Sequence, residues 1–137
     1  MPSSAYSTTL LAKKLGIKSG HKIRLINQPA NYFQLFTDWP ANVEISGDET
    51  IKKDFIHYFS TSAKELEANI LLLKKEIKSN GIIWISWYKK AAKIPTDVTE
   101  DFIRNLALAN GLVDIKVCAV DEIWSGLKLV IPVKDRV

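Results

Sequence analysis

The chain has 137 residues, of which 47% are hydrophobic and 25% are charged, with a formal net charge of +4. This balance is typical of one globular domain and excludes a disordered chain, a collagen-like repeat and a disulfide-rich scaffold. Its single cysteine and two histidines exclude a zinc site of the usual Cys/His type. Sixteen of the nineteen basic residues are lysines, which favours a solvated surface over base-specific recognition of nucleic acid.

The first 60 residues predict two short helices and three strands. Apolar residues at helical spacing in residues 10–16 predict a short helix that stops at a glycine. The β-branched run at residues 22–27 predicts the first strand, and aromatic residues at helical spacing predict a helix over residues 31–39. Two further strands are predicted at residues 43–46 and 54–59, with a Gly-Asp turn after the first of them.

A long amphipathic helix is predicted over residues 62–79. Ser62 and Glu65 have the spacing of a capping box, in which the two side chains satisfy free backbone amides at the start of a helix. Gly81 predicts a left-handed C-cap that ends this helix. The β-branched and aromatic run at residues 82–87 is typical of a parallel strand that is buried on both faces.

The last third of the chain predicts one more helix and an antiparallel hairpin. Asp97 and Glu100 have the spacing of a second capping box, which opens a helix that ends near residue 110. Strands at residues 112–120 and 124–133 are joined by a short connection, which implies a hairpin. Because helices and strands alternate before it, we predict a single three-layer α/β domain over residues 1–137, built around a mostly parallel sheet.

This arrangement resembles the Rossmann-like fold of S-adenosylmethionine-dependent methyltransferases over about residues 20–133. The resemblance implies a six-stranded sheet in the order 2-1-3-4-6-5, one strand fewer than those enzymes usually have. The chain also contains the stretches LAKKLGI (residues 11–17), WYKK (87–90), TDVTED (96–101) and VDIKVCAVDEIWSGLK (113–128). In these stretches it resembles an uncharacterised bacterial family, domain of unknown function 3052, which has no established activity.

The methyltransferase resemblance implies a glycine-rich turn after the first strand, where the backbone approaches the cofactor closely. In this chain the turn at residues 27–32 has no glycine, and Pro29 removes one amide donor. After the third strand, where amino-methyltransferases carry an Asp/Asn-Pro-Pro-aromatic motif, residues 60–62 are Ser-Thr-Ser. We therefore expect that the cofactor turn has been lost and that the chain binds neither a cofactor nor a metal.

Candidate ligand-binding residues follow from where open α/β sheets bind ligands, which is outside the carboxyl ends of the strands at the topological switch point. That crevice is expected between the first and third strands. The candidates are Asn27, Gln28, Ser60, Thr61, Ser62, Trp87, Lys89, Lys90, Asp121, Glu122, Trp124 and Ser125. Helix capping, core packing and solvation are the competing explanations for these residues. His57 and Cys118 are expected to be buried core residues, and no catalytic residue is predicted.

Three functional hypotheses fit these residues. We favour a non-catalytic module that binds a small anion or a protein partner, which would cover Trp87 and Trp124 if they are exposed. The alternative is a small enzyme, methyltransferase-like or other, with a lysine of residues 89–90 near an acid of residues 121–122 at the carboxyl edge. Weak nucleic-acid binding through the lysines is least favoured. The sequence leaves open whether the protein forms a homodimer. The polar N-terminal residues 1–9 and the short apolar runs predict a cytoplasmic protein without membrane contact.

Overall fold

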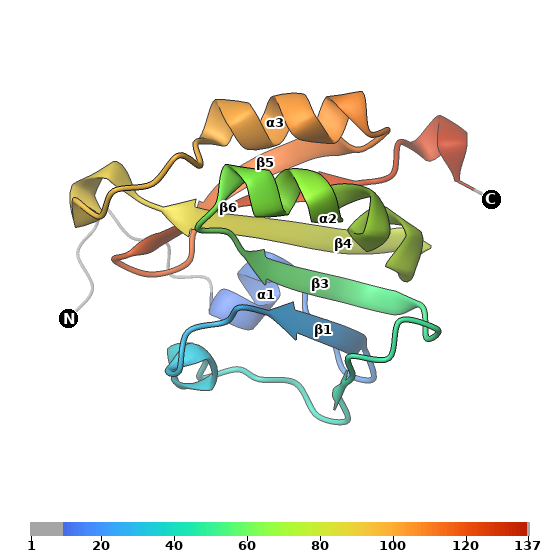
Figure 1. Cartoon of the computed structure of the whole chain (residues 1–137). Coiled ribbons are helices and arrows are strands. Elements are labelled where there is room, and N and C mark those ends of the chain that lie inside the picture. The colour runs from blue at the N-terminus through green and yellow to red at the C-terminus, as the bar shows by residue number, and fades with distance from the viewer. Residues whose placement is uncertain (1–9, 137) are drawn as a thin grey trace.

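The computed structural model describes residues 10–136, and its strands pair into one six-stranded sheet (Figure 1). The strands are β1 (Lys22–Ile26), β2 (Glu44–Ile45), β3 (Lys53–Phe59), β4 (Ile77–Tyr88), β5 (Val113–Ala119) and β6 (Trp124–Val130). Their order is β2-β1-β3-β4-β6-β5. The first four strands are parallel, whereas β6 is antiparallel to both β4 and β5. The predicted α/β class, strand order and closing hairpin are confirmed, with both hairpin strands shorter than predicted.

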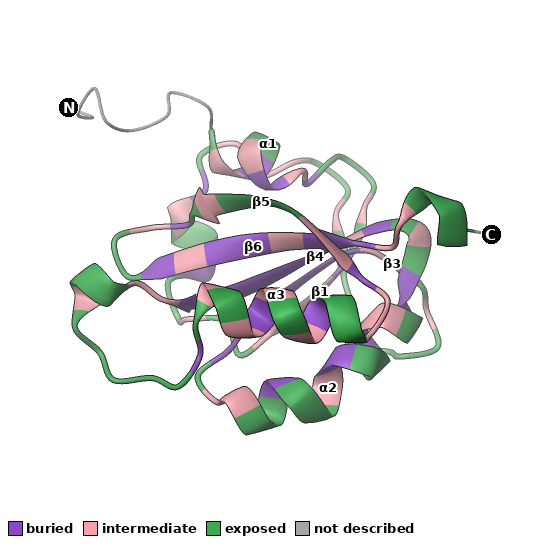
Figure 2. Ribbon diagram, turned by 90° about the horizontal axis from the view of Figure 1, so that it is seen from above, coloured by how far each residue is buried: buried purple, intermediate pink, exposed green. Residues whose placement is uncertain are grey.

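Helices cover both faces of the sheet (Figures 1 and 2). The elements are α1 (Leu11–Leu15), α2 (Ala63–Glu76), α3 (Glu100–Ala109) and the 3-10 turns η1 (Tyr32–Leu35), η2 (Lys90–Ala92) and η3 (Val133–Asp135). One apolar cluster lies between the sheet and α2 and α3, and a second lies on the side of α1 and η1. No helix within residues 10–136 is long and apolar enough to cross a membrane.

Residues 31–39 form only the short turn η1, so the helix predicted for this segment is wrong. Tyr32 is 1% exposed, and its ring lies edge-on to that of Phe59 with 5.7 Å between the centroids. After the turn the backbone is extended at Phe36, which places the Phe36 and Trp39 rings 4.9 Å apart. Packing of aromatic rings, rather than a helical hydrogen-bond ladder, therefore decides the conformation of this segment.

α2 ends at Glu76 rather than near residue 79, and Gly81 is not its C-cap. The Glu76 carboxylate accepts a 2.6 Å hydrogen bond from Arg24 Nη1 and lies 3.0 Å from Lys53 Nζ. The next residue, Ile77, already pairs with Lys53 in the sheet, so β4 begins at once. Gly81 lies inside β4, where a Cβ atom would come within 3.0 Å of the Lys53 carbonyl oxygen. Close approach of two backbones therefore explains this glycine.

The two predicted capping boxes have different outcomes. Ser62 caps α2 with its hydroxyl, as predicted. Thr99 rather than Asp97 caps α3, because Val98 is buried in the core at 1% exposure and the helix begins only after Thr99. Asp97 instead accepts a 3.0 Å hydrogen bond from the backbone amide of Ala63, the first residue of α2.

His57 is a satisfied core histidine, as predicted. Its Nδ1 lies 2.9 Å from the Tyr32 hydroxyl and its Nε2 lies 2.8 Å from Ser86 Oγ. Complete burial lowers the pKa of His57 to about 3, so the ring is neutral. Cys118 is less buried than predicted, because it lies on β5, the outermost strand of the sheet.

Candidate functional site

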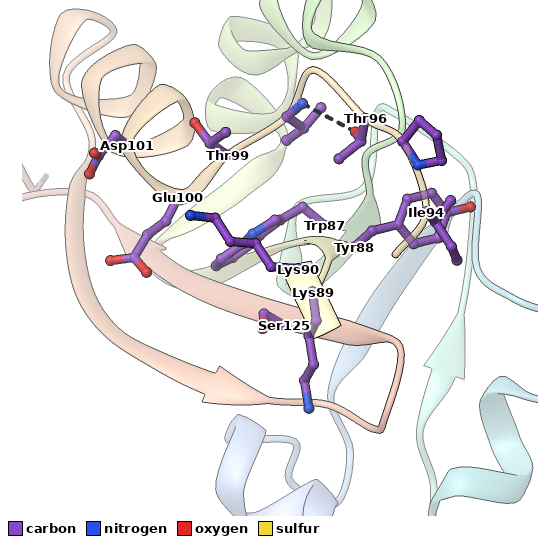
Figure 3. Close-up of a pocket in the computed structure, with 12 residues that line it drawn as sticks. Trp87, Tyr88, Lys89, Lys90, Ile94, Thr96, Thr99, Glu100, Asp101 and Ser125 are labelled. Atoms are coloured by element: carbon purple, nitrogen blue, oxygen red, sulfur yellow. Dashed lines mark hydrogen bonds between the residues drawn. The ribbon is translucent and has the colours of Figure 1, made fainter. Parts of the chain in front are cut away.

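A pocket of about 730 Å³ lies at the carboxyl end of β4, beside the starts of α3 and β6 (Figure 3). Its lining combines aromatic, hydroxyl and charged side chains. The lining residues are Trp87, Tyr88, Lys89, Lys90, Ile94, Pro95, Thr96, Val98, Thr99, Glu100, Asp101 and Ser125. The volume lies within the range of small-molecule sites, and the position is the edge at which open α/β sheets bind ligands. This pocket is the candidate functional site.

The sheet supplies one wall of the pocket through the β4–β6 pairing. Trp87 and Ser125 lie directly opposite each other in this pairing, so their side chains share the face that carries α3. The Trp87 ring is only 8% exposed, which makes it a rigid apolar surface. The neighbouring pair, Tyr88 and Trp124, lies on the alternate register, and their rings stack with 4.4 Å between the centroids. Strand alternation therefore places Trp87 in the pocket and directs Trp124 into the core on the α1 side.

The two lysines after β4 point in different directions. In Figure 3 the Lys90 side chain extends across the pocket toward Thr99 and Glu100, whereas that of Lys89 points away. The backbone amide of Lys89 donates a 2.8 Å hydrogen bond to the carbonyl of Ile123 in the hairpin turn. This bond ties the end of β4 to the hairpin, and Lys90 then begins η2. Lys90 is therefore the lysine available to an anion in the pocket.

The opposite side of the pocket is acidic. Glu100 and Asp101 lie in the first turn of α3, and both carboxylates form ion pairs with Arg104. Arg104 Nε also donates a 2.9 Å hydrogen bond to Asp114 on β5. Hydrogen bonds from Arg104 to Glu100 and then to Asp114 raise its pKa, so this guanidinium stays charged. The acids are thus partly neutralised by Arg104, while Lys90 forms no ion pair with another residue of the described chain.

The pocket contains four of the twelve residues that the sequence suggested as ligand-binding candidates: Trp87, Lys89, Lys90 and Ser125. The other eight do not line it, namely Asn27, Gln28, Ser60, Thr61, Ser62, Asp121, Glu122 and Trp124. Residues 94–101 also form a wall of the pocket, which the sequence analysis did not predict. The position of this segment directly after β4, at the carboxyl edge of the sheet, could have indicated it. Asp97 and Glu100 were interpreted only as helix-capping residues.

The expected crevice between β1 and β3 is occupied by structural contacts. The Asn27 amide donates to the Phe59 carbonyl at 3.4 Å, and the backbone amide of Ser60 donates to the Ser86 carbonyl at 2.8 Å. Ser60 is 1% exposed. The start of α2, which could otherwise attract an anion, already holds the Asp97 carboxylate. Helix capping therefore accounts for Ser62, and contacts to strand carbonyls account for Asn27 and Ser60.

The acids of the hairpin turn do not meet the lysines. Asp121 Oδ1 accepts 2.8 Å hydrogen bonds from the backbone amides of both Ile123 and Trp124, so it shapes the turn. No ion pair within residues 10–136 joins Asp121 or Glu122 to either lysine. The lysine–acid pair of the enzyme hypothesis is therefore not formed. Trp87 and Trp124 are both buried, which counts against a protein partner that covers them.

The turn after β1 does not fit S-adenosylmethionine, the cofactor that the methyltransferase-like fold implies. Asn27 holds the left-handed conformation with a φ of 58°, and Pro29 lacks an amide donor. The segment that follows is the four-residue turn η1, which offers no helix start to a ligand. Within residues 10–136, no group of three or more His, Cys, Asp or Glu side chains is placed to hold a metal ion.

The fold is shared with known methyltransferases. One is a SAM-dependent methyltransferase from Aquifex aeolicus, with 17% identity and a TM-score of 0.63 over 88% of this chain and 87% of that chain. A protein described as a type 11 methyltransferase from Sulfolobus solfataricus has 15% identity and a TM-score of 0.60 over 88% and 89%. Magnesium protoporphyrin IX methyltransferase from Synechocystis PCC 6803 has 11% identity and a TM-score of 0.52 over 88% and 78%.

The structural similarity establishes a methyltransferase-like Rossmann fold, and at these low identities it shows nothing about activity. No protein-family model and no curated protein matches the sequence. The resemblance to domain of unknown function 3052 therefore stays a prediction.

Proposed function

We propose that the pocket at the end of β4 binds a small anionic ligand on a methyltransferase-like fold. The observation that carries this proposal is Lys90, whose side chain extends across a pocket of about 730 Å³ and pairs with no carboxylate of residues 10–136. Thr96 and Ser125 add hydroxyl groups to the lining, and Trp87 adds an apolar wall. Polar groups that converge on a concave surface with an aromatic wall can orient a small molecule.

The charged side chains that line the β4 pocket indicate which groups its ligand carries. An anionic group is expected next to Lys90, because an ammonium group attracts carboxylates and phosphates as a point charge. Glu100 and Asp101 on the opposite side favour a hydrogen-bond donor or a cationic group on the same ligand. A small metabolite that carries an anionic group at one end and a donor group at the other matches both sides.

Methyl transfer from S-adenosylmethionine is the second candidate function. The comparisons favour the enzyme alternative over a non-catalytic module, because the three neighbours described above are methyltransferases by name. The glycine-free turn after β1 argues in the other direction. Methyl transfer therefore stands second to ligand binding in the β4 pocket.

One NMR titration separates these proposals. Inorganic phosphate, adenosine 5′-monophosphate and S-adenosylhomocysteine are added in turn to the ¹⁵N-labelled protein. Ligand binding in the β4 pocket predicts saturable shifts of the amides of Lys90, Thr96 and Ser125 with at least one anion. Tight binding of S-adenosylhomocysteine with shifts at Asn27 and Gln28 would restore methyl transfer to first place. If all three probes leave the pocket amides unshifted at millimolar concentration, the anion proposal is wrong.

A further inference from the structure

A second cavity lies beside β1, at the edge of α2, on the sheet face that carries α2 and α3. In Figure 1 α2 and α3 lie over β4, β6 and β5, while β1 emerges beyond them on that face. The cavity has a volume of about 110 Å³ and lies between β1, β3 and the side of α2. A water molecule takes about 30 Å³ of liquid, so the space suits about four waters or one very small organic molecule. It shares no residue with the β4 pocket.

Arg24 presents unused hydrogen-bond donors to this cavity. Its Nη1 donates to Glu76 at 2.6 Å, but within residues 10–136 its Nε and Nη2 have no hydrogen-bond partner. This is the one hydrogen bond of the guanidinium to the described chain, and the side chain is 23% exposed. A guanidinium whose Nε and Nη2 are both free can donate two parallel hydrogen bonds to a carboxylate.

Tyr58 supplies a further donor to the same cavity. Its hydroxyl oxygen accepts a 3.1 Å hydrogen bond from the Asn69 amide, which leaves the hydroxyl hydrogen to donate elsewhere. No acceptor for this hydrogen lies within residues 10–136, although Tyr58 is only 2% exposed. Burial is the largest cause that raises the pKa of Tyr58, so the phenol remains protonated at neutral pH. A nearly buried donor without an acceptor indicates that something else accepts from it.

Ion pairs connect the charged groups at the cavity to the buried Lys53 behind it. Glu76 is 6% exposed and faces two cations, Arg24 at 2.6 Å and the fully buried Lys53 at 3.0 Å. The three groups together carry one excess positive charge. Glu49, the other acid in the lining, is 76% exposed and lies 3.8 Å from Arg24, so solvent screens its contribution. With Glu49 included the four groups are neutral, so an incoming carboxylate would be held by the free donors of Arg24 and Tyr58 rather than by a net charge.

We propose that this cavity binds a small aliphatic monocarboxylate, with its carboxylate on Arg24 and Tyr58 and its alkyl group against Ile26, Leu72 and Leu73. The site is separate from the β4 pocket and does not rest on the function proposed for it. Acetate and propionate have the size that the volume allows.

Sodium propionate is titrated into the ¹⁵N-labelled protein at constant ionic strength, with propionamide as the uncharged isostere. Propionate is expected to shift the amides of Ile26, Tyr58 and Asn69 saturably, with a dissociation constant in the millimolar range that befits so small a ligand. Propionamide is expected to cause no saturable shift. Equal binding of both compounds would overturn the proposal, as would propionate shifts confined to the β4 pocket.

Two variants test the residues themselves. Arg24→Gln is expected to abolish propionate binding, whereas Arg136→Gln, an exposed arginine outside the cavity, is expected to bind as the parent protein does. Because Arg24 also supports Glu76, the fold of R24Q is checked by its NMR spectrum. Tyr58→Phe keeps the ring and removes only the hydroxyl, and it is expected to weaken binding about tenfold. If Y58F binds propionate with unchanged affinity, the assignment is wrong.

Discussion

The Asp97 carboxylate accepts a 3.0 Å hydrogen bond from the backbone amide of Ala63, so the loop that walls the β4 pocket also caps the start of α2. The two residues are 34 positions apart in the sequence. The contact places a negative charge at the positive end of the α2 dipole. It also fixes the position of residues 94–99, which form much of the pocket lining.

Replacing Asp97 by Ala should therefore destabilise the protein. Loss of a helix-capping acceptor costs about 1 kcal/mol, which corresponds to a fall in melting temperature of about 3–5 °C for a chain of this size. Asp97→Asn keeps an acceptor oxygen and should cost less. Asp135→Ala, an exposed acid in η3, is the matched control in thermal unfolding. Equal melting temperatures for D97A and D135A would show that the Asp97–Ala63 contact contributes nothing.

A matched pair of lysine variants tests the β4 pocket. Lys90→Gln removes the ammonium group that extends across the pocket, whereas Lys89→Gln removes one that points away from it (Figure 3). K90Q is expected to weaken the binding of inorganic phosphate about tenfold, and K89Q is expected to change it less than about twofold. The dissociation constants are measured by NMR titration at fixed ionic strength. Equal effects would mean that phosphate responds only to the general positive charge of this edge.

The sheet could be predicted from the sequence because its strands carry strong local patterns. The buried run at residues 82–87 and the hairpin at the end of the chain fix the centre and one edge of the sheet. The end of α2 could not be predicted in the same way. It depends on ion pairs from Glu76 to Arg24 and Lys53, which are distant in sequence and become neighbours only in the folded sheet.

The candidate site was partly predictable for a similar reason. The rule that ligands bind at the carboxyl ends of strands led to Trp87, Lys90 and Ser125, because each lies next to a strand end. It also led to Ser60 and Asp121, whose polar groups bond to backbone groups nearby. Sequence spacing does not reveal which polar groups already form hydrogen bonds within the protein and which are free to bind a ligand. Only the hydrogen bonds of the folded chain separate the two.

His57 should make the stability of the protein depend on pH. Its pKa falls from 6.5 in the unfolded chain to about 3 in the folded one, so between these values only the unfolded state takes up the proton. Stability is therefore fully present above about pH 6.5 and is lost as the pH falls toward 3, by at most about 1.4 kcal/mol per pH unit. The hydroxyl of Thr50 lowers the pKa of Asp48 from 3.8, so this acid contributes only in the lower part of that range.

Urea unfolding at a series of pH values between 4.5 and 7 checks this dependence. His57→Gln should remove most of the slope, whereas His21→Gln should leave most of it, because His21 is only partly buried. Since Gln does not reproduce the packing of a fully buried ring, the ring of His57 is also observed directly by NMR in the parent protein. A ring that takes up its proton near pH 6.5 in the folded state would contradict the prediction.

Gly126 should tolerate no side chain. A Cβ atom at this position of β6 would lie 2.9 Å from Trp84 Cε3 and 3.4 Å from Ser86 Oγ. Trp84 is fully buried and its Nε1 donates a 2.7 Å hydrogen bond to the Leu15 carbonyl, so the indole is not free to move aside. Gly126→Ala should therefore cost about 1–3 kcal/mol in the free energy of unfolding.

Gly47 provides the matched control for this substitution. A Cβ atom at Gly47 would meet no atom of residues 10–136 within 4 Å, and its backbone does not require a positive φ. Gly47→Ala should leave stability unchanged or raise it by about 0.4–1 kcal/mol, because alanine reduces the freedom of the unfolded chain. The free energy of unfolding of both variants, measured by chemical denaturation, separates the clash at residue 126 from the general effect of replacing glycine by alanine. If G126A also releases α1, hydrogen exchange at the amides of residues 14–17 should accelerate, because the indole that anchors Leu15 is the group displaced.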